Sequence, residues 1–208
     1  GKMWLTASPD DDNGDEHSWV ESPVFNIDKL SFPLLSVDIY QSVEEGRDGA
    51  VLQYSVDDGD TWKLLGRMDE GLGWYNNTGI VSNPGDQEGT GNIGWSANTN
   101  QWQTARFPLD SVRQASRNSY YPGVRFRMSY SSDNGNAEGL ELNGFGFDNF
   151  MVSQRSRIVM LEQFINSAWD KEMQVQEEAW MDEFVENRKE EVVDMRYHTK
   201  LGFQADPL

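Results

Sequence analysis

The chain has 208 residues, of which 17 are Lys or Arg and 35 are Asp or Glu, so its net charge is −18. Such a surface repels the phosphates of nucleic acids and suits a cation, a basic partner or plain solubility. The chain has no cysteine, which excludes a disulfide framework, a thiolate nucleophile and a Cys-ligated zinc. It also has no run of about 18 apolar residues that would span a membrane.

Short alternating segments separated by turn residues predict strands through the first three quarters of the chain. We expect eight strands, at residues 4–7, 18–25, 34–41, 50–56, 61–66, 101–109, 123–131 and 146–153, with no helix among them. Residues 67–100 are rich in Gly and Asn and predict loops. This pattern is typical of a β-sandwich. Because a strand begins almost at the first residue, we expect the chain to start inside a domain, with an N-terminal strand missing.

A hairpin is predicted at residues 49–65, where two strand patterns flank Asp57-Asp58-Gly59-Asp60. The series Ser55-x-Asp57-x-Gly59-x-Thr61-Trp62 matches the Asp-box hairpin. In that hairpin the Asp carboxylate caps the amides of the turn, the Gly adopts a positive φ angle and the Trp packs beneath. We therefore expect a self-capped turn here rather than a cation site. A sialidase propeller would repeat the box every 40–50 residues or so, and we find one copy.

The pattern changes after residue 155. Residues 158–165 form an apolar run typical of a buried strand, residues 172–191 carry apolar side chains at helical spacing, and residues 192–198 predict another strand. Strand, helix and strand in this order are a βαβ unit. The unit cannot bury both of its own faces, so it indicates a fragment of an α/β domain.

Three segments in order carry a resemblance. They are Met3-Trp4-Leu5-Thr6 followed by Trp19-Val20-Glu21-Ser22-Pro23-Val24-Phe25-Asn26, the Asp-box hairpin, and Gly144-Phe145-Gly146-Phe147-Asp148-Asn149-Phe150. The set is similar to MAM-like and reelin-like jelly rolls, especially those in exported bacterial proteins of the type IX secretion and gliding-motility systems. The resemblance implies that residues 1–155 form a jelly-roll β-sandwich.

Residues 156–208 resemble the start of a thioredoxin-like domain, through the strand Val159-Met160-Leu161-Glu162-Gln163-Phe164. The family places Cys-x-x-Cys just after this strand, where the present chain has Asn166-Ser167-Ala168-Trp169. Without thiols, disulfide exchange cannot occur. We therefore expect an incomplete, degenerate thioredoxin-like βαβ segment, and a fold class that is mainly β with a partial α/β segment.

A structural calcium ion is one expectation. Asp10, Asp12 and Asp15 surround Gly14 in an acidic loop, and Ca²⁺ prefers several hard oxygen ligands. The loop does not complete an EF-hand, so a solvated acidic loop is the alternative. The resemblance adds Asp148, because the Asp of the closing strand in MAM-like jelly rolls helps to bind calcium. Asp148 is equally compatible with a turn or hydrogen-bonding role.

Three aromatic residues in the loop region, Trp74, Tyr75 and Trp95, lie beside Asn and Asp residues. Exposed rings next to amides are typical of sugar or partner contacts. The alternative is that these rings belong to the core of the sandwich.

The sequence thus predicts a non-catalytic binding or assembly module of an exported protein on the outer surface of a Gram-negative bacterium, as a component or substrate of the type IX apparatus. Its partners would be other cell-surface or secretion proteins, or a glycan. The alternative is an accessory, glycan-binding domain of a large secreted hydrolase. No Ser/His/Asp set can be argued from the two histidines, so we do not expect an enzyme.

Overall fold

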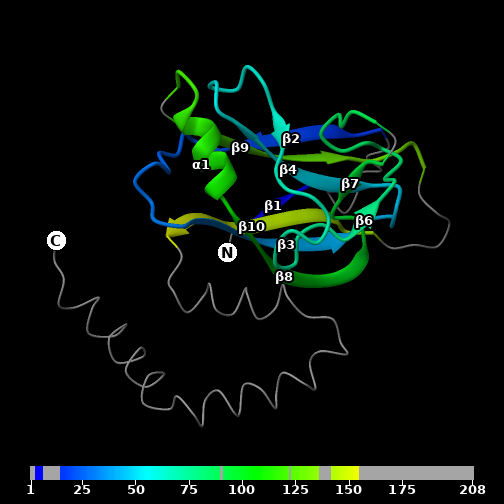
Figure 1. Ribbon diagram of the computed structural model, residues 1–208. Helices are drawn as coiled ribbons and strands as arrows, with labels where there is room; N and C mark the ends of the chain where they lie inside the picture. The colour runs from blue at the N-terminus through cyan, green and yellow to red at the C-terminus, as the bar shows by residue number, and fades with distance from the viewer. Residues whose placement is uncertain (1–2, 7–14, 90, 122, 136–141, 155–208) are drawn as a thin grey trace, which may run out of the picture. The chain divides into compact units, whose positions relative to one another are not determined.

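Buried and exposed side chains alternate along most of the long strands of this protein. We describe residues 3–6, 15–89, 91–121, 123–135 and 142–154 of a computed structural model. All of them lie in the first of the two units into which the chain divides, Gly1–Gln163. This part of the chain is mainly β, as predicted, and two four-stranded antiparallel sheets face each other in a sandwich-like arrangement (Figure 1).

The first sheet, termed the β3 sheet, has the strand order β1-β10-β3-β8. Its strands are β1 (Trp4–Leu5), β10 (Gly144–Gln154), β3 (Pro33–Ser42) and β8 (Asn98–Pro108). The second sheet, termed the β4 sheet, has the order β2-β9-β4-β5. Its strands are β2 (His17–Glu21), β9 (Arg125–Ser131), β4 (Gly49–Ser55) and β5 (Lys63–Leu64). A separate short pair joins β6 (Asn77–Thr78) to β7 (Ile93–Gly94).

The core lies between the two sheets. In β3 the alternate residues Leu35, Val37 and Ile39 are fully buried, whereas the intervening Ser36, Asp38 and Tyr40 are partly exposed on the outer face. This is the period of two that a strand with one buried face requires. Aromatic rings from the two sheets meet in the middle, for example Tyr130 of β9 and Phe145 of β10, with ring centroids 6.4 Å apart.

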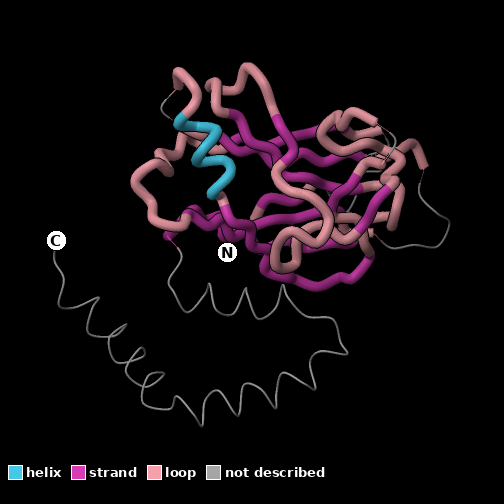
Figure 2. Tube along the Cα trace, in the orientation of Figure 1, coloured by secondary structure: helices cyan, strands magenta, loops and turns pink. Residues whose placement is uncertain are grey.

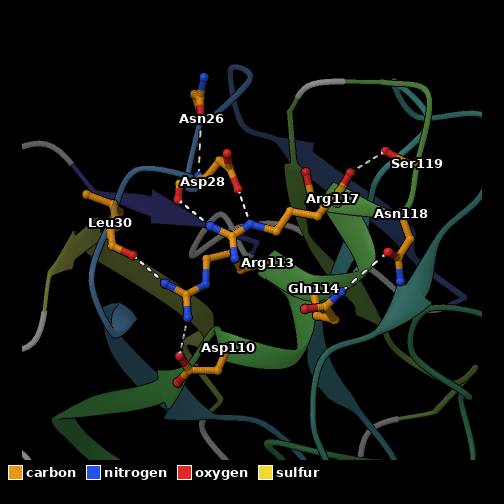
Figure 3. Close-up of polar contacts among 10 residues, drawn as sticks. Asn26, Asp28, Leu30, Asp110, Arg113, Gln114, Arg117, Asn118 and Ser119 are labelled. Carbon is orange, nitrogen blue, oxygen red and sulfur yellow. Dashed lines mark hydrogen bonds and ion pairs between the residues drawn. The ribbon is translucent and has the colours of Figure 1, made fainter.

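The predicted absence of a helix is wrong. Helix α1 (Asp110–Arg117) follows β8 and buries Val112. Asp110 lies in its first turn and Arg117 in its last, and both charges interact favourably with the helix dipole. The arginines of α1 also bind the chain segment before β3. Arg113 donates to the carbonyl of Leu30 at 2.6 Å, and Arg117 pairs with Asp28 (Figure 3). Eight residues with a single buried apolar side chain give little periodic signal, which explains why the sequence pattern missed this helix.

The other predicted strands are present, with ends shifted by a few residues. Predicted strand 18–25 stops as β2 at Glu21, and Phe25 makes only an isolated bridge to Val124. Predicted strand 61–66 shrinks to the two residues of β5. Residues 67–97 are mostly loop, as expected, around the short β6–β7 pair (Figure 2). The predicted βαβ segment at 156–208 lies outside the described residues.

Candidate functional site

The turn between β4 and β5 is capped by its own side chains. One carboxylate oxygen of Asp57 accepts hydrogen bonds from the Thr61 amide at 2.9 Å and the Ser55 hydroxyl at 2.6 Å, and the other accepts from the Thr61 hydroxyl. Gly59 has φ +100°, and its amide donates to the Ser55 hydroxyl. These bonds lower the pKa of Asp57 to about 2. The hydrogen bonding predicted for this turn is confirmed.

The three aromatic residues expected to contact a sugar or a partner are buried. Trp74 and Tyr75 are each 3% exposed and Trp95 is 0% exposed. Their rings pack together with centroids 4.8–5.4 Å apart, and Phe107 of β8 lies against Trp74. Rings enclosed on this scale present no face to a ligand. The prediction that these residues contact a sugar or a partner is therefore wrong, and the alternative, that they belong to the core, fits the structure.

The polar atoms of this buried aromatic cluster (Trp74, Tyr75, Trp95) are satisfied inside the protein. The indole N–H of Trp74 donates to the Leu65 carbonyl at 2.9 Å, and that of Trp95 donates to the Gly73 carbonyl at 3.0 Å. The Tyr75 hydroxyl lies 2.9 Å from the Leu65 carbonyl and 3.1 Å from the Leu52 carbonyl. Burial raises the pKa of Tyr75 far above its usual range. The cluster contributes buried apolar area with internal polar anchors, which is the role of core aromatics.

The carboxylates predicted to bind calcium fall in different places. Asp10 and Asp12 lie outside the described residues. Asp15 is exposed, and its amide donates to the Asp133 carbonyl just after β9, at the end of the β4 sheet. Asp148 lies in the middle of β10 in the β3 sheet, directly opposite Asp38. Among the described residues, no three acidic or histidine side chains form a group that could hold a metal. The calcium ion stays a prediction.

A buried acidic residue that the sequence did not single out lies near Asp15. Asp48 is 4% exposed, and its carboxylate accepts from the amides of Asp133 at 3.0 Å and Glu44 at 3.3 Å. Burial, above all, raises its pKa. Arg47 forms ion pairs with both Glu44 and Asp133. These contacts tie the turn after β3 to the end of β9, which is a structural function.

A hollow opens between the sheets where the edge strands β1 and β2 lie. Its volume is about 130 Å³, and its lining is mostly apolar. Trp4, Phe145 and Phe147 line it from the β3 sheet, and Met128 and Tyr130 line it from the β4 sheet. Trp4 stacks on Phe147 with centroids 6.3 Å apart and is still 59% exposed. This open edge combines a cavity with an exposed aromatic ring.

The outer face of the β3 sheet carries a second exposed aromatic residue. Trp102 of β8 is 47% exposed and packs against Tyr40 of β3, with centroids 5.6 Å apart. Neither residue was selected from the sequence. The period of two across residues 101–109 predicts a strand, but it does not say which face looks to solvent.

Comparison with known proteins gives no family for this chain: no protein-family model matches it, and neither does any curated protein. None of the helices in the described part of the chain is long and apolar enough to cross a membrane.

Proposed function

We propose that this protein is a non-catalytic binding or assembly module of an exported bacterial cell-surface protein, and that it takes up its partner at the open edge between β1 and β2. The observation that carries the proposal is the hollow at that edge. Apolar side chains from both sheets form most of its walls, together with Thr6, Glu16 and Ser18, and a volume of about 130 Å³ suits one large apolar side chain.

The exposed ring at the mouth supports the same use. Trp4 is more than half exposed although its ring stacks on Phe147. A large ring held by one partner and open on its other side is the kind of residue that dominates binding energy at interfaces. β1 and β2 are also the edge strands of their sheets among the described residues, so an extended segment could pair beside them.

The setting of the module comes from the resemblance. The segments around Trp4 and Trp19, the Asp-box hairpin and the segment around Phe147 together resemble MAM-like and reelin-like jelly rolls of the type IX secretion and gliding-motility systems. We accordingly propose a jelly roll, followed by a degenerate thioredoxin-like segment, acting on the outer surface of a Gram-negative bacterium among other surface or secretion proteins. The acidic, cysteine-free composition is compatible with this setting.

Site-specific photo-crosslinking on intact cells tests the proposal. A photoreactive phenylalanine analogue replaces Trp4 in the full-length protein, expressed in its own bacterium. We expect crosslinks to one or a few surface proteins, detected by mass spectrometry after illumination. External protease should remove the crosslinked species from intact cells, because the module is exported.

The matched control places the same analogue at Val81, which is equally exposed at 60% but lies in the loop before β7. Crosslinks that are equally frequent at both positions would contradict docking at the open edge. A product that stays protected from external protease would contradict the surface location.

The alternative function, an accessory domain of a large secreted hydrolase, is favoured by one observation. The outer face of the β3 sheet carries exposed Trp102 beside Asp38 and Thr104, a combination suited to a polymeric substrate. A hydrolase domain in the same polypeptide would support this alternative.

A further inference from the structure

Four residues form an apolar row across the outer face of the β3 sheet. Register pairs Leu5 with Gly146, Gly146 with Tyr40, and Tyr40 with Trp102, so these residues share one face on four neighbouring strands. The row spans three strand spacings of about 4.8 Å, or about 14 Å in all. Gly146 contributes no side chain, and the Leu5 side chain lies over it, 3.3 Å from where a Cβ would stand. Trp102, at the edge strand β8, keeps nearly half of its surface open to solvent.

A polar row runs beside it, two residues further along each strand. Asp148, Asp38 and Thr104 are paired in register. The Asp38 carboxylate accepts from the Thr104 hydroxyl at 2.6 Å through one oxygen and from the Asn149 amide at 2.8 Å through the other. These bonds lower the pKa of Asp38, so it is ionised near neutral pH. They also fix its orientation while each oxygen keeps a further lone pair for an incoming hydroxyl.

Asn149 reaches this row through an irregularity of β10. The register between β10 and β3 shifts between Asp148 and Met151, and Asn149 has φ +50°. A bulge of this kind re-aims a side chain, and here it carries an amide to the Asp38 carboxylate. A second amide group, Asn100, accepts from the Tyr40 hydroxyl at 3.0 Å at the other side of the apolar row. The aromatic row is thus bordered by oriented polar groups on both sides.

We propose that the outer face of the β3 sheet binds a neutral saccharide chain, with the Trp102 ring stacked on a sugar ring and Asp38, Thr104 and Asn149 bonded to hydroxyl groups. A sugar ring has an apolar face bordered by hydroxyls, which matches an apolar row next to a polar one. The proposal rests on the proposed function as a binding module and gives it a second ligand class.

Charge selects the class of saccharide. Asp38 and Asp148 lie opposite each other in the polar row, and the whole chain has a net charge of −18. Arg106, two residues beyond Thr104 in β8, interacts with Asp38 and offsets one of these two negative charges. Uronate or sulfate groups would still meet a net negative charge and be repelled. The same charges exclude a nucleic acid strand stacked on Trp102, because its phosphates would be repelled too. An uncharged polymer of hydroxyl-rich rings is left as the ligand that both rows accept.

Affinity electrophoresis of the 208-residue protein tests the inference. Native gels contain galactomannan, dextran or hydroxyethylcellulose as neutral probes, and alginate as an anionic probe. We expect at least one neutral polymer to retard the protein and alginate not to. Trp102→Ala should weaken the retardation constant at least tenfold, Trp102→Phe should restore part of it, and Thr104→Val should weaken it a few-fold.

Trp19→Ala is the matched control, because Trp19 is 58% exposed on the β4 sheet. It should bind like the unaltered protein. Far-UV circular dichroism shows that each variant is folded before it is scored. The inference is overturned if no neutral polymer retards the protein, if alginate retards it more strongly, or if Trp102→Ala and Trp19→Ala bind alike.

The two experiments test the open edge and the outer face of the β3 sheet independently. Crosslinking at position 4 reports on the open edge, and it does not require a sugar. Retardation that depends on Trp102 reports on the β3 sheet and does not require a protein partner. Loss of the crosslink with Trp102-dependent retardation intact would remove docking at the open edge and leave a saccharide-binding module.

Discussion

The buried aromatic cluster and the apolar row on the β3 sheet both contain Trp and Tyr, but the rings are buried in the cluster and partly exposed in the row. In the cluster, Trp95 is fully buried and its indole N–H bonds to the Gly73 carbonyl. In the row, Trp102 is 47% exposed and packs on Tyr40 alone among aromatic rings of the described residues. The first arrangement closes all its polar groups inside the protein, whereas the second leaves a ring face and its polar neighbours open to solvent.

This difference teaches that a Trp beside Asn or Thr is not itself a sign of binding. What distinguishes the two is the destination of the polar groups. The hydrogen bonds of Tyr75 end on the backbone of Leu52 and Leu65, so they hold the loop onto the sheet. Those of Thr104 and Asn149 end on the Asp38 carboxylate, which can accept more.

Replacing Trp95 by Ala should have the largest effect. The change removes a fully buried ring that packs on Trp74, Tyr75 and Phe145. We expect a loss of about 3–5 kcal/mol in the free energy of unfolding, because a cavity remains where the ring was. Urea denaturation followed by circular dichroism measures this loss.

Trp102→Ala is the matched control for stability, since it removes the same ring from the exposed row. It should change the free energy of unfolding by about 0.5 kcal/mol or less. Equal losses in the two variants would contradict the division into a structural cluster and a binding row.

Calcium removal is the next largest expected effect. The resemblance implies a calcium ligand at Asp148, which lies in the polar row of the β3 sheet. A site half-saturated at micromolar calcium adds about 4 kcal/mol of stability at millimolar calcium. Excess chelator should therefore lower the melting temperature of the unaltered protein, measured by calorimetry.

Asp148→Asn should make the protein insensitive to the chelator, whereas Asp69→Asn, in an exposed loop, should not. If excess chelator leaves the melting temperature of the unaltered protein unchanged, the prediction that calcium stabilises the fold is contradicted.

The mainly β class could be predicted because each long strand buries one face. In β9, Phe126, Met128 and Tyr130 face the core and Arg125 and Arg127 do not, so a period of two is visible in the sequence. The self-capped turn at Asp57 was predictable for a local reason, since the hydrogen bonds of the Asp57 carboxylate lie within residues 55–61. Helix α1 was not, because its anchors Asp28 and Leu30 are more than 80 residues away in sequence.

The candidate sites could not be predicted either, because their residues are far apart in the sequence. Tyr40, Trp102 and Gly146 become one row only through the strand order β10-β3-β8, which the sequence pattern does not supply. The sequence could not decide between solvent and core for the loop residues Trp74 and Trp95, because a loop segment can lie on the surface or fold inward. Here the loop folds inward, and Gly66 at φ +79° permits it, since a Cβ at that position would lie 2.3 Å from the Phe107 ring.

Removing a single hydroxyl compares the two regions more finely. Tyr75→Phe keeps the buried ring but loses the hydroxyl between the Leu52 and Leu65 carbonyls. Each carbonyl keeps another donor, the Leu65 amide for Leu52 and the Trp74 indole for Leu65. The buried Leu52 amide, however, donates to the Tyr75 hydroxyl at 3.3 Å and loses this acceptor. We therefore expect a loss of about 1–3 kcal/mol.

Tyr40→Phe is the control in the exposed row, where the hydroxyl bonds to Asn100. Water can replace that hydroxyl, so the change should stay within about 0.5 kcal/mol. A greater loss for Tyr40→Phe than for Tyr75→Phe in urea denaturation would contradict the contrast.

The smallest expected effect concerns acid. The pKa of Asp57 is about 2 in the folded protein, against an ordinary value of 3.8, because Ser55 and Thr61 donate hydrogen bonds to its carboxylate. A depressed folded pKa gives stability that is present above pH 3.8 and is lost as pH falls toward 2. The amide that replaces this carboxylate in the Asp57→Asn variant does not titrate. The difference in stability between the unaltered protein and Asp57→Asn should thus shrink between about pH 5 and pH 2.

The buried cluster should behave differently over the same range. Its only titratable group, Tyr75, has a pKa raised by burial, so it stays neutral throughout. The deficit of Trp95→Ala should accordingly be the same at both ends of that pH range, when each variant is compared with the unaltered protein in urea. If the Trp95→Ala deficit changed with pH as much as the Asp57→Asn deficit, the cluster would be coupled to the exposed carboxylates. Its internal hydrogen bonds would then not account for its stability on their own.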